Sequence, residues 1–135
     1  MLAAALALAA CGTVSASTAM RSWVTQSAFS SAVTTLRTDA RHAATALRDP
    51  RSTPNLLHTV CAVLSLDAQQ ANSALPSPDD QSTTLLGRAY TQFGRGAERC
   101  FGAAANSASR AAAITELQRA IATLAEADAR VAAAS

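Results

Sequence analysis

Four stretches of the chain carry apolar residues at intervals that alternate between four and three positions. They cover residues 29–47, 57–75, 86–104 and 114–131. This spacing places the apolar side chains on one face of an α-helix, whereas a half-buried strand would alternate apolar and polar residues. In the last stretch the predicted apolar seam comprises Ile114, Leu117, Ile121, Leu124 and Val131. The pattern therefore predicts an all-α protein with four helices.

Short segments rich in Pro, Ser, Asp and Asn separate the four stretches. They lie at residues 49–54, 76–80 and 106–109. Pro54 and Pro78 suit the first position of a helix, where the missing N–H group is no loss. Because short connections make consecutive helices antiparallel, we expect an up-down-up-down four-helix bundle over residues 19–135.

The composition excludes several classes of function but does not identify one. The chain has 135 residues, enough for one domain, and 35 of them are alanine, so we expect a closely packed core. All 11 basic residues are arginine, and the absence of lysine excludes a phosphate-binding P-loop and a Schiff-base lysine. The net charge of +2 is too small to indicate binding to nucleic acid, and we expect no such partner.

The chain begins with an apolar run that ends in Leu8-Ala9-Ala10-Cys11 and is followed by Gly12. This run resembles the lipobox of bacterial lipoproteins. The resemblance implies that residues 1–10 are a signal peptide, that the chain is cut before Cys11, and that the Cys11 thiol carries a diacylglyceryl group. Two or three acyl chains, palmitate among them, would hold the protein on the membrane, with residues 11–18 as a tether.

The predicted signal segment is short, and no basic residue precedes Arg21, so we expect that it is truncated at its start. The alternative is that residues 2–10 form the first turns of a helix, with Cys11 as a free thiol in a cytosolic protein. A transmembrane span is not expected, because it needs about 20 consecutive apolar residues.

Cys61 and Cys100 remain as an even pair if Cys11 is acylated, and both lie on the apolar seams of adjacent stretches. In an oxidising compartment this arrangement favours a disulfide. A tight turn centred on Ser77 would leave the two cysteines about 10 Å apart along the helix axes, so the third stretch must begin late or bend at its glycines. The alternative is a pair of buried free thiols.

No catalytic or metal-binding pattern is evident, and we expect neither an enzyme nor a cofactor. His42 and His58 lack further ligands at a metal-binding spacing, and both are expected on the surface. The absence of G-x-S-x-G and S-x-x-K motifs argues against a nucleophilic serine. Asp67 and Asp128 are the only acids at or beside the seams, and as a buried pair they would be candidates for acid–base chemistry.

Four arginines gather around the end of the first stretch: Arg37, Arg41, Arg48 and Arg51. They form either a solvated helix terminus that complements the helix dipole or a contact surface for anionic lipid headgroups or an acidic envelope polymer. Trp23 precedes the first stretch and either lies at the lipid interface or covers the open end of the bundle.

The segment from Cys61 through Leu75-Pro76-Ser77-Pro78-Asp79 to Cys100 also resembles small Ala- and Arg-rich lipoproteins of actinobacteria. Together with the lipobox, it implies a protein anchored through Cys11 on the extracytoplasmic face of the cell membrane. We expect a non-catalytic protein that acts by binding or scaffolding, with a protein or an envelope polymer as partner. The alternative is a carrier that holds a small apolar or lipid ligand between its helices, with a cavity near the glycines of the third stretch.

Overall fold

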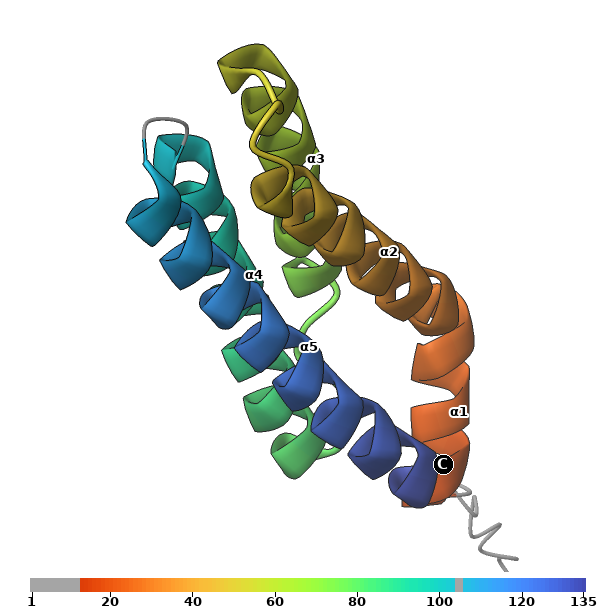
Figure 1. The fold of residues 1–135 in the computed structure, drawn as a ribbon. Helices are drawn as coiled ribbons and strands as arrows, with labels where there is room; N and C mark the ends of the chain where they lie inside the picture. Colours follow the sequence, from red (N-terminus) through yellow and green to blue (C-terminus); the bar gives the residue numbers. More distant parts are fainter. Residues whose placement is uncertain (1–12, 104–105) are drawn as a thin grey trace, which may run out of the picture.

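The computed structural model describes residues 13–103 and 106–135, and these residues form five helices that pack against one another, with no strand (Figure 1). In chain order the helices are α1 (Ala16–Gln26), α2 (Phe29–Arg48), α3 (Pro54–Asn72), α4 (Asp80–Gly102) and α5 (Ser107–Ala134). The all-α prediction is confirmed, and the four predicted stretches correspond to α2, α3, α4 and α5. Helix α2 packs on α3 and α5, and α4 packs on the same two helices.

Polar side chains define where several helices begin. Thr53 caps α3 by accepting a hydrogen bond from the backbone N–H of Leu56, and Pro54 takes the first helical position as predicted. The expectation for Pro78 is wrong, because α4 begins two residues later. There Asp79 is the N-cap and accepts from the backbone N–H of Ser82 at 2.7 Å. A carboxylate satisfies the free N–H groups of the first turn, which proline cannot do.

The core follows the predicted seams in α2, α3 and α4, but it is shifted by one position in part of α5. There Ile114 and Ile121 are only partly buried, and the buried seam is Ala113, Leu117, Ala120, Leu124, Ala127 and Val131. Alanine at alternate seam positions lets α5 approach its neighbours closely, and the isoleucines flank the contact. Gly96 on α4 shows how close the approach is, because a Cβ atom there would lie 2.6 Å from Leu117 Cδ2.

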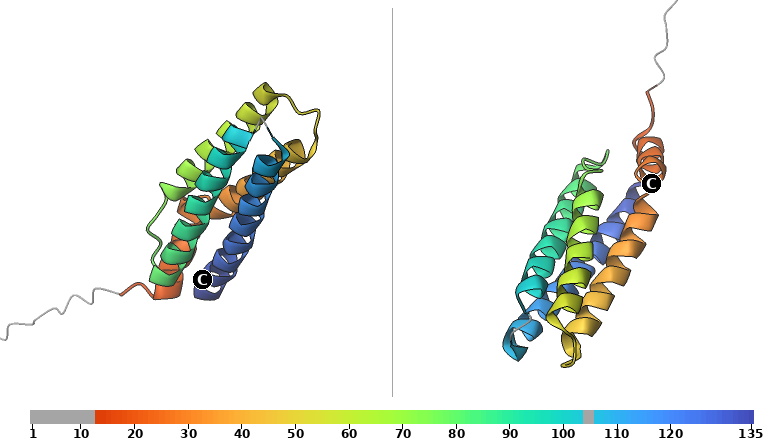
Figure 2. Two further views of the ribbon diagram at one scale, coloured as in Figure 1. Left: turned by 60° about the vertical axis from the view of Figure 1, so that its left-hand side comes forward. Right: turned by 90° about the horizontal axis from the view of Figure 1, so that it is seen from above.

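Helix α1 was not predicted, and it begins at Ala16, within the segment expected to be a tether. The chain bends sharply between α1 and α2, where Ala28 has a φ of 50°, in the left-handed region. Two further views show α1 set at an angle to α2 (Figure 2). Helix α1 contacts α2 and α5, Met20 is fully buried, and Arg21 Nη1 donates to the backbone carbonyl of Ser135 at 2.6 Å.

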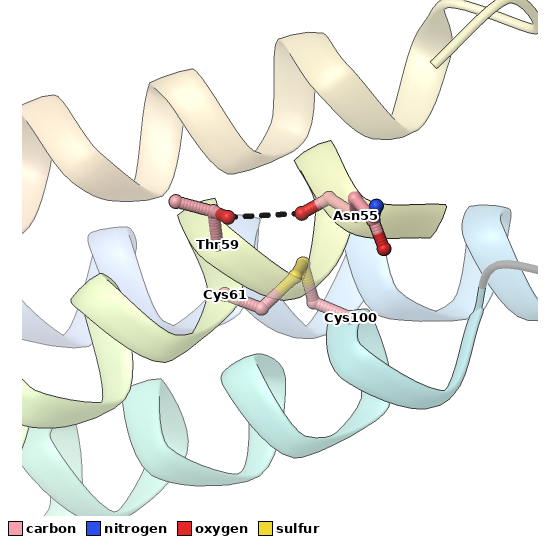
Figure 3. Close-up of a disulfide and its surroundings, with 4 residues drawn as sticks. All are labelled: Asn55, Thr59, Cys61 and Cys100. Atoms are coloured by element: carbon pink, nitrogen blue, oxygen red, sulfur yellow. Dashed lines mark hydrogen bonds between the residues drawn. A yellow bond between two sulfur atoms is a disulfide. The ribbon is translucent and has the colours of Figure 1, made fainter. Parts of the chain in front are cut away.

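The predicted disulfide between Cys61 and Cys100 is present and joins α3 to α4, with a Cα–Cα distance of 5.8 Å (Figure 3). Helix α3 ends 11 residues after Cys61, whereas α4 begins 20 residues before Cys100. This leaves an axial difference of about 14 Å at 1.5 Å per residue. The connection from 73 to 79 runs on beyond the end of α3 before α4 begins (Figure 1), so it absorbs the difference while α4 continues through its glycines.

Candidate functional site

A cavity of about 570 Å³ lies where α1, α2 and the end of α3 meet over α4. Its volume is within the range of about 300–1,000 Å³ that is typical of small-molecule sites. Three of the five aromatic residues of the chain line it, although they come from three different helices: Trp23, Phe29 and Tyr90. This concentration of aromatic side chains makes the cavity the best candidate for a binding site.

The aromatic wall is held in place by contacts that fix each ring. Trp23 packs on Phe29 with ring centroids 5.5 Å apart, and its indole N–H donates to the backbone carbonyl of Ala74 at 3.1 Å. This bond ties α1 to the turn that follows α3. Tyr90 is 5% exposed, and its burial raises the pKa of the phenol to about 12, so it is neutral at physiological pH. Tyr90 therefore brings no phenolate charge to the lining.

The bend at Ala28 shapes the cavity, because it turns α1 away from the axis of α2. A residue other than glycine in the left-handed conformation costs about 1–2 kcal/mol, which the packing of α1 has to offset. Beside it, Ser27 is part of the lining, and its buried hydroxyl has no hydrogen-bond partner among the described residues.

One carboxylate lies in the lining of the cavity, and a second one interacts with it. Asp67 of α3 is part of the lining, and Asp39 of α2 is within hydrogen-bonding reach of it. The pKa of Asp39 is raised, first because partial burial penalises the charged form, and then because the hydrogen bond with Asp67 and its negative charge oppose ionisation; His42 acts in the opposite direction. The sequence pattern indicates Asp67 as a candidate, but together with Asp128 rather than with Asp39.

Asp128 instead forms an ion pair with Arg37 at 3.0 Å, which joins α5 to α2. The four arginines that were expected to gather are therefore spread out. Arg37 lies about 16 Å along α2 from Arg48, and Arg51 pairs with the neighbouring Asp49 at 3.3 Å. Arg41 and Arg48 are exposed and form no ion pair with any residue that the structure describes.

The remaining candidates also have defined places. His42 is exposed, whereas His58 is half-buried and stacks on Phe101 with ring centroids 4.1 Å apart. No group of three or more His, Cys, Asp or Glu side chains in the described ranges is arranged to hold a metal ion. Cys11 lies outside the described residues, so its expected acylation stays a prediction.

Two smaller hollows lie between α3 and α4. One, of about 450 Å³, is an apolar groove beside the disulfide that includes Leu66 and Phe101. The other, of about 260 Å³, is polar and includes Gly94. The expectation of a ligand cavity near the glycines of the third stretch is therefore met only by this small polar hollow. The aromatic cavity lies elsewhere, because it depends on α1, which the expectation did not include.

Among the described residues no helix combines the length and the apolar character needed to cross a membrane. No protein-family model matches the chain, and neither a curated protein nor a solved structure matches it. The interpretation of the cavity therefore rests on the chemistry of its own residues.

Proposed function

We propose that this chain is a lipid-anchored binding protein of the extracytoplasmic membrane face, which holds a small, mainly apolar ligand in the cavity between α1, α2 and α3. The observation that carries the proposal is the convergence of Trp23, Phe29 and Tyr90 on one cavity of about 570 Å³. Aromatic side chains supply a large apolar contact area at low cost in conformational entropy. The protein acts by binding and not by catalysis.

The scaffold that we propose for this site is an antiparallel four-helix bundle formed by α2, α3, α4 and α5. Its support is the closed circuit of packing, in which α2 contacts α3, α3 contacts α4, α4 contacts α5, and α5 returns to α2. Helix α1 is an addition at one end of this bundle. It creates the cavity by lying across the end instead of extending α2.

The anchor that we propose is the acylated Cys11 of the lipobox. Helix α1 begins at Ala16, so five residues of chain, at most about 17 Å, separate the anchor from a helix that lines the cavity. The cavity would then stand close to the membrane surface. A protein or an envelope polymer at the same location is also a conceivable partner. No surface of the described residues indicates such a partner, whereas the cavity indicates a small ligand.

Intact mass spectrometry of the protein isolated from membranes tests the anchor. We expect a chain of 125 residues beginning at Cys11, with the added mass of two or three acyl chains and two hydrogens fewer for the disulfide. The variant Cys11→Ser should keep residues 1–10 and carry no acyl chain. An unmodified, uncleaved wild-type protein would refute the lipoprotein assignment.

Fluorescence tests the cavity, because Trp23 is the only tryptophan of the chain and lies in the lining. Titration with 1-decanol should shift its emission in a saturable way. Ala32 also lines the cavity, and Ala32→Phe should fill it and abolish the shift. Ala62→Phe is the matched control, because Ala62 lines the groove beside the disulfide instead. A shift that survives Ala32→Phe would place the ligand elsewhere.

A further inference from the structure

We propose that the cavity selects a cationic amphiphile, an apolar body that carries one protonated or quaternary amine. This inference rests on the proposed function and adds the charge of the ligand to it. The carboxylate of Asp67, with Asp39 beside it, would be the counter-charge, and the aromatic wall would receive both the cation and the apolar body.

The first observation is that no arginine pairs with either of these two acids among the described residues. Among the described residues that line the cavity, Asp67 is the only one with a charged side chain. Neither Asp67 nor Asp39 forms an ion pair with an arginine in the part of the chain that the structure describes. By contrast, Asp49, Asp79 and Asp128 each form one. His42 lowers the pKa of Asp39, but no arginine neutralises the carboxylate of Asp67 that lines the cavity.

The second observation is the proximity of the two carboxylates. Two like charges within hydrogen-bonding reach repel each other, and the raised pKa of Asp39 has this repulsion among its causes. A bound cation offsets the repulsion, because it adds an attractive charge to both acids at once. A ligand with a carboxylate would increase the repulsion, so the same pair would exclude fatty acids and other anions.

The third observation is the aromatic wall itself. The faces of Trp, Tyr and Phe attract ammonium groups within about 6 Å of the ring centroid, and quaternary ammonium ligands are often bound in this way. No arginine is part of the lining to occupy these faces. Trp23 is half-buried and offers the accessible aromatic surface, whereas Tyr90 is neutral because burial raises the pKa of its phenol to about 12, so it adds no competing negative charge. Charge and aromatic surface thus indicate the same class of ligand.

The test compares three probes with the same ten-carbon chain: decyltrimethylammonium, 1-decanol and decanoate. Each is titrated below its micelle concentration into the full chain carrying Cys11→Ser, with Trp23 fluorescence as the readout. We expect the ammonium probe to bind at least about tenfold more tightly than the alcohol, which corresponds to one cation–π contact together with one ion pair. Decanoate should not bind measurably.

Asp67→Asn should abolish the preference for the ammonium probe and leave the affinity for 1-decanol unchanged. Asp39→Asn should weaken the preference for the ammonium probe. Asp80→Asn is the control, because Asp80 is exposed at the start of α4 and does not line the cavity. Thermal unfolding of each variant establishes that it is folded. Equal affinities for the ammonium and the alcohol would overturn this inference and leave the proposed function intact. If none of the three probes binds, both are refuted.

Discussion

Loss of the disulfide between Cys61 and Cys100 should remove a large part of the stability of this protein. The bond closes a loop with a sequence separation of 39. In the chain-entropy model a loop of this length stabilises the folded state by about 4 kcal/mol at 25 °C, because it restricts the unfolded chain. Domains of this size have free energies of unfolding of about 5–15 kcal/mol. The disulfide would thus supply from about a quarter to most of the total.

Two forms of the protein separate the effect of the bond from the effect of packing. Reduced wild-type protein keeps both sulfur atoms and loses only the covalent link. The double variant Cys61→Ala/Cys100→Ala also loses the buried sulfurs, because both residues are at most 1% exposed, and it should be less stable than the reduced form. We expect reduction to lower Tm by roughly 15 °C and the alanine pair to lower it further.

Urea unfolding followed by circular dichroism measures these differences, with Cys11→Ser in every form so that the third thiol cannot exchange. The dependence of the free energy of unfolding on urea should also steepen on reduction, because an unfolded chain without the link exposes more surface. Coincident urea midpoints for the oxidised and reduced wild-type proteins would refute the loop-entropy argument.

Three further predictions concern other parts of the molecule, and thermal or urea unfolding measures each of them. Gly94→Ala should stabilise the protein by about 1 kcal/mol, because a Cβ there meets nothing within 4 Å, whereas Gly96→Ala should not, because its Cβ meets a buried leucine. The arginine partner of Asp79 on α5 holds the pKa of this carboxyl well below its usual range. The stabilisation that ionised Asp79 gives the folded state is therefore present above its unfolded pKa near 3.8 and is lost as the pH falls toward the folded pKa. The difference in stability between wild type and Asp79→Asn should accordingly shrink below about pH 4. The pKa of Asp39 is raised in the folded state, so the stabilisation from its protonated form is present in acid and is lost as the pH rises through the folded pKa. Asp67→Asn should therefore raise Tm near neutral pH and leave Tm unchanged in acid.

Much of the fold could be predicted because its helices bury a regular seam. In α2 every predicted seam residue is buried, from Phe29 to Leu47, since a helix of 20 residues with one apolar face has a single stable orientation. The seam of α5 was harder to predict, because hydrophobicity ranks Ile121 above Ala120, yet Ala120 is the buried residue. Helix α5 packs closely on α4, where Gly96 meets Leu117, and a rule applied within one helix does not include the neighbouring helix.

Helix α1 could not be predicted from an apolar period, because only Met20 is fully buried in it. Its stability comes from contacts at its ends, such as the bond from Trp23 to Ala74, which joins residues 51 positions apart. The bend that orients it depends on Ala28 in the left-handed conformation, and sequence rules reserve that conformation for Gly and Asn. The cavity depends on this bend, so a sequence pattern that shows the aromatic residues does not show that they meet.

The arrangement of charges gives the strongest reason to regard the cavity as a functional feature. Arg37 joins α2 to α5, and Arg130 of α5 binds Asp79 at the start of α4, so the arginine–aspartate pairs connect distant elements of the fold. Asp39 and Asp67 form no such pair, and after desolvation their mutual repulsion is among the causes that raise the pKa of Asp39. Such repulsion is typical of binding sites, where groups are arranged for a ligand and not for the empty protein. The cation that we propose between the helices would offset this repulsion.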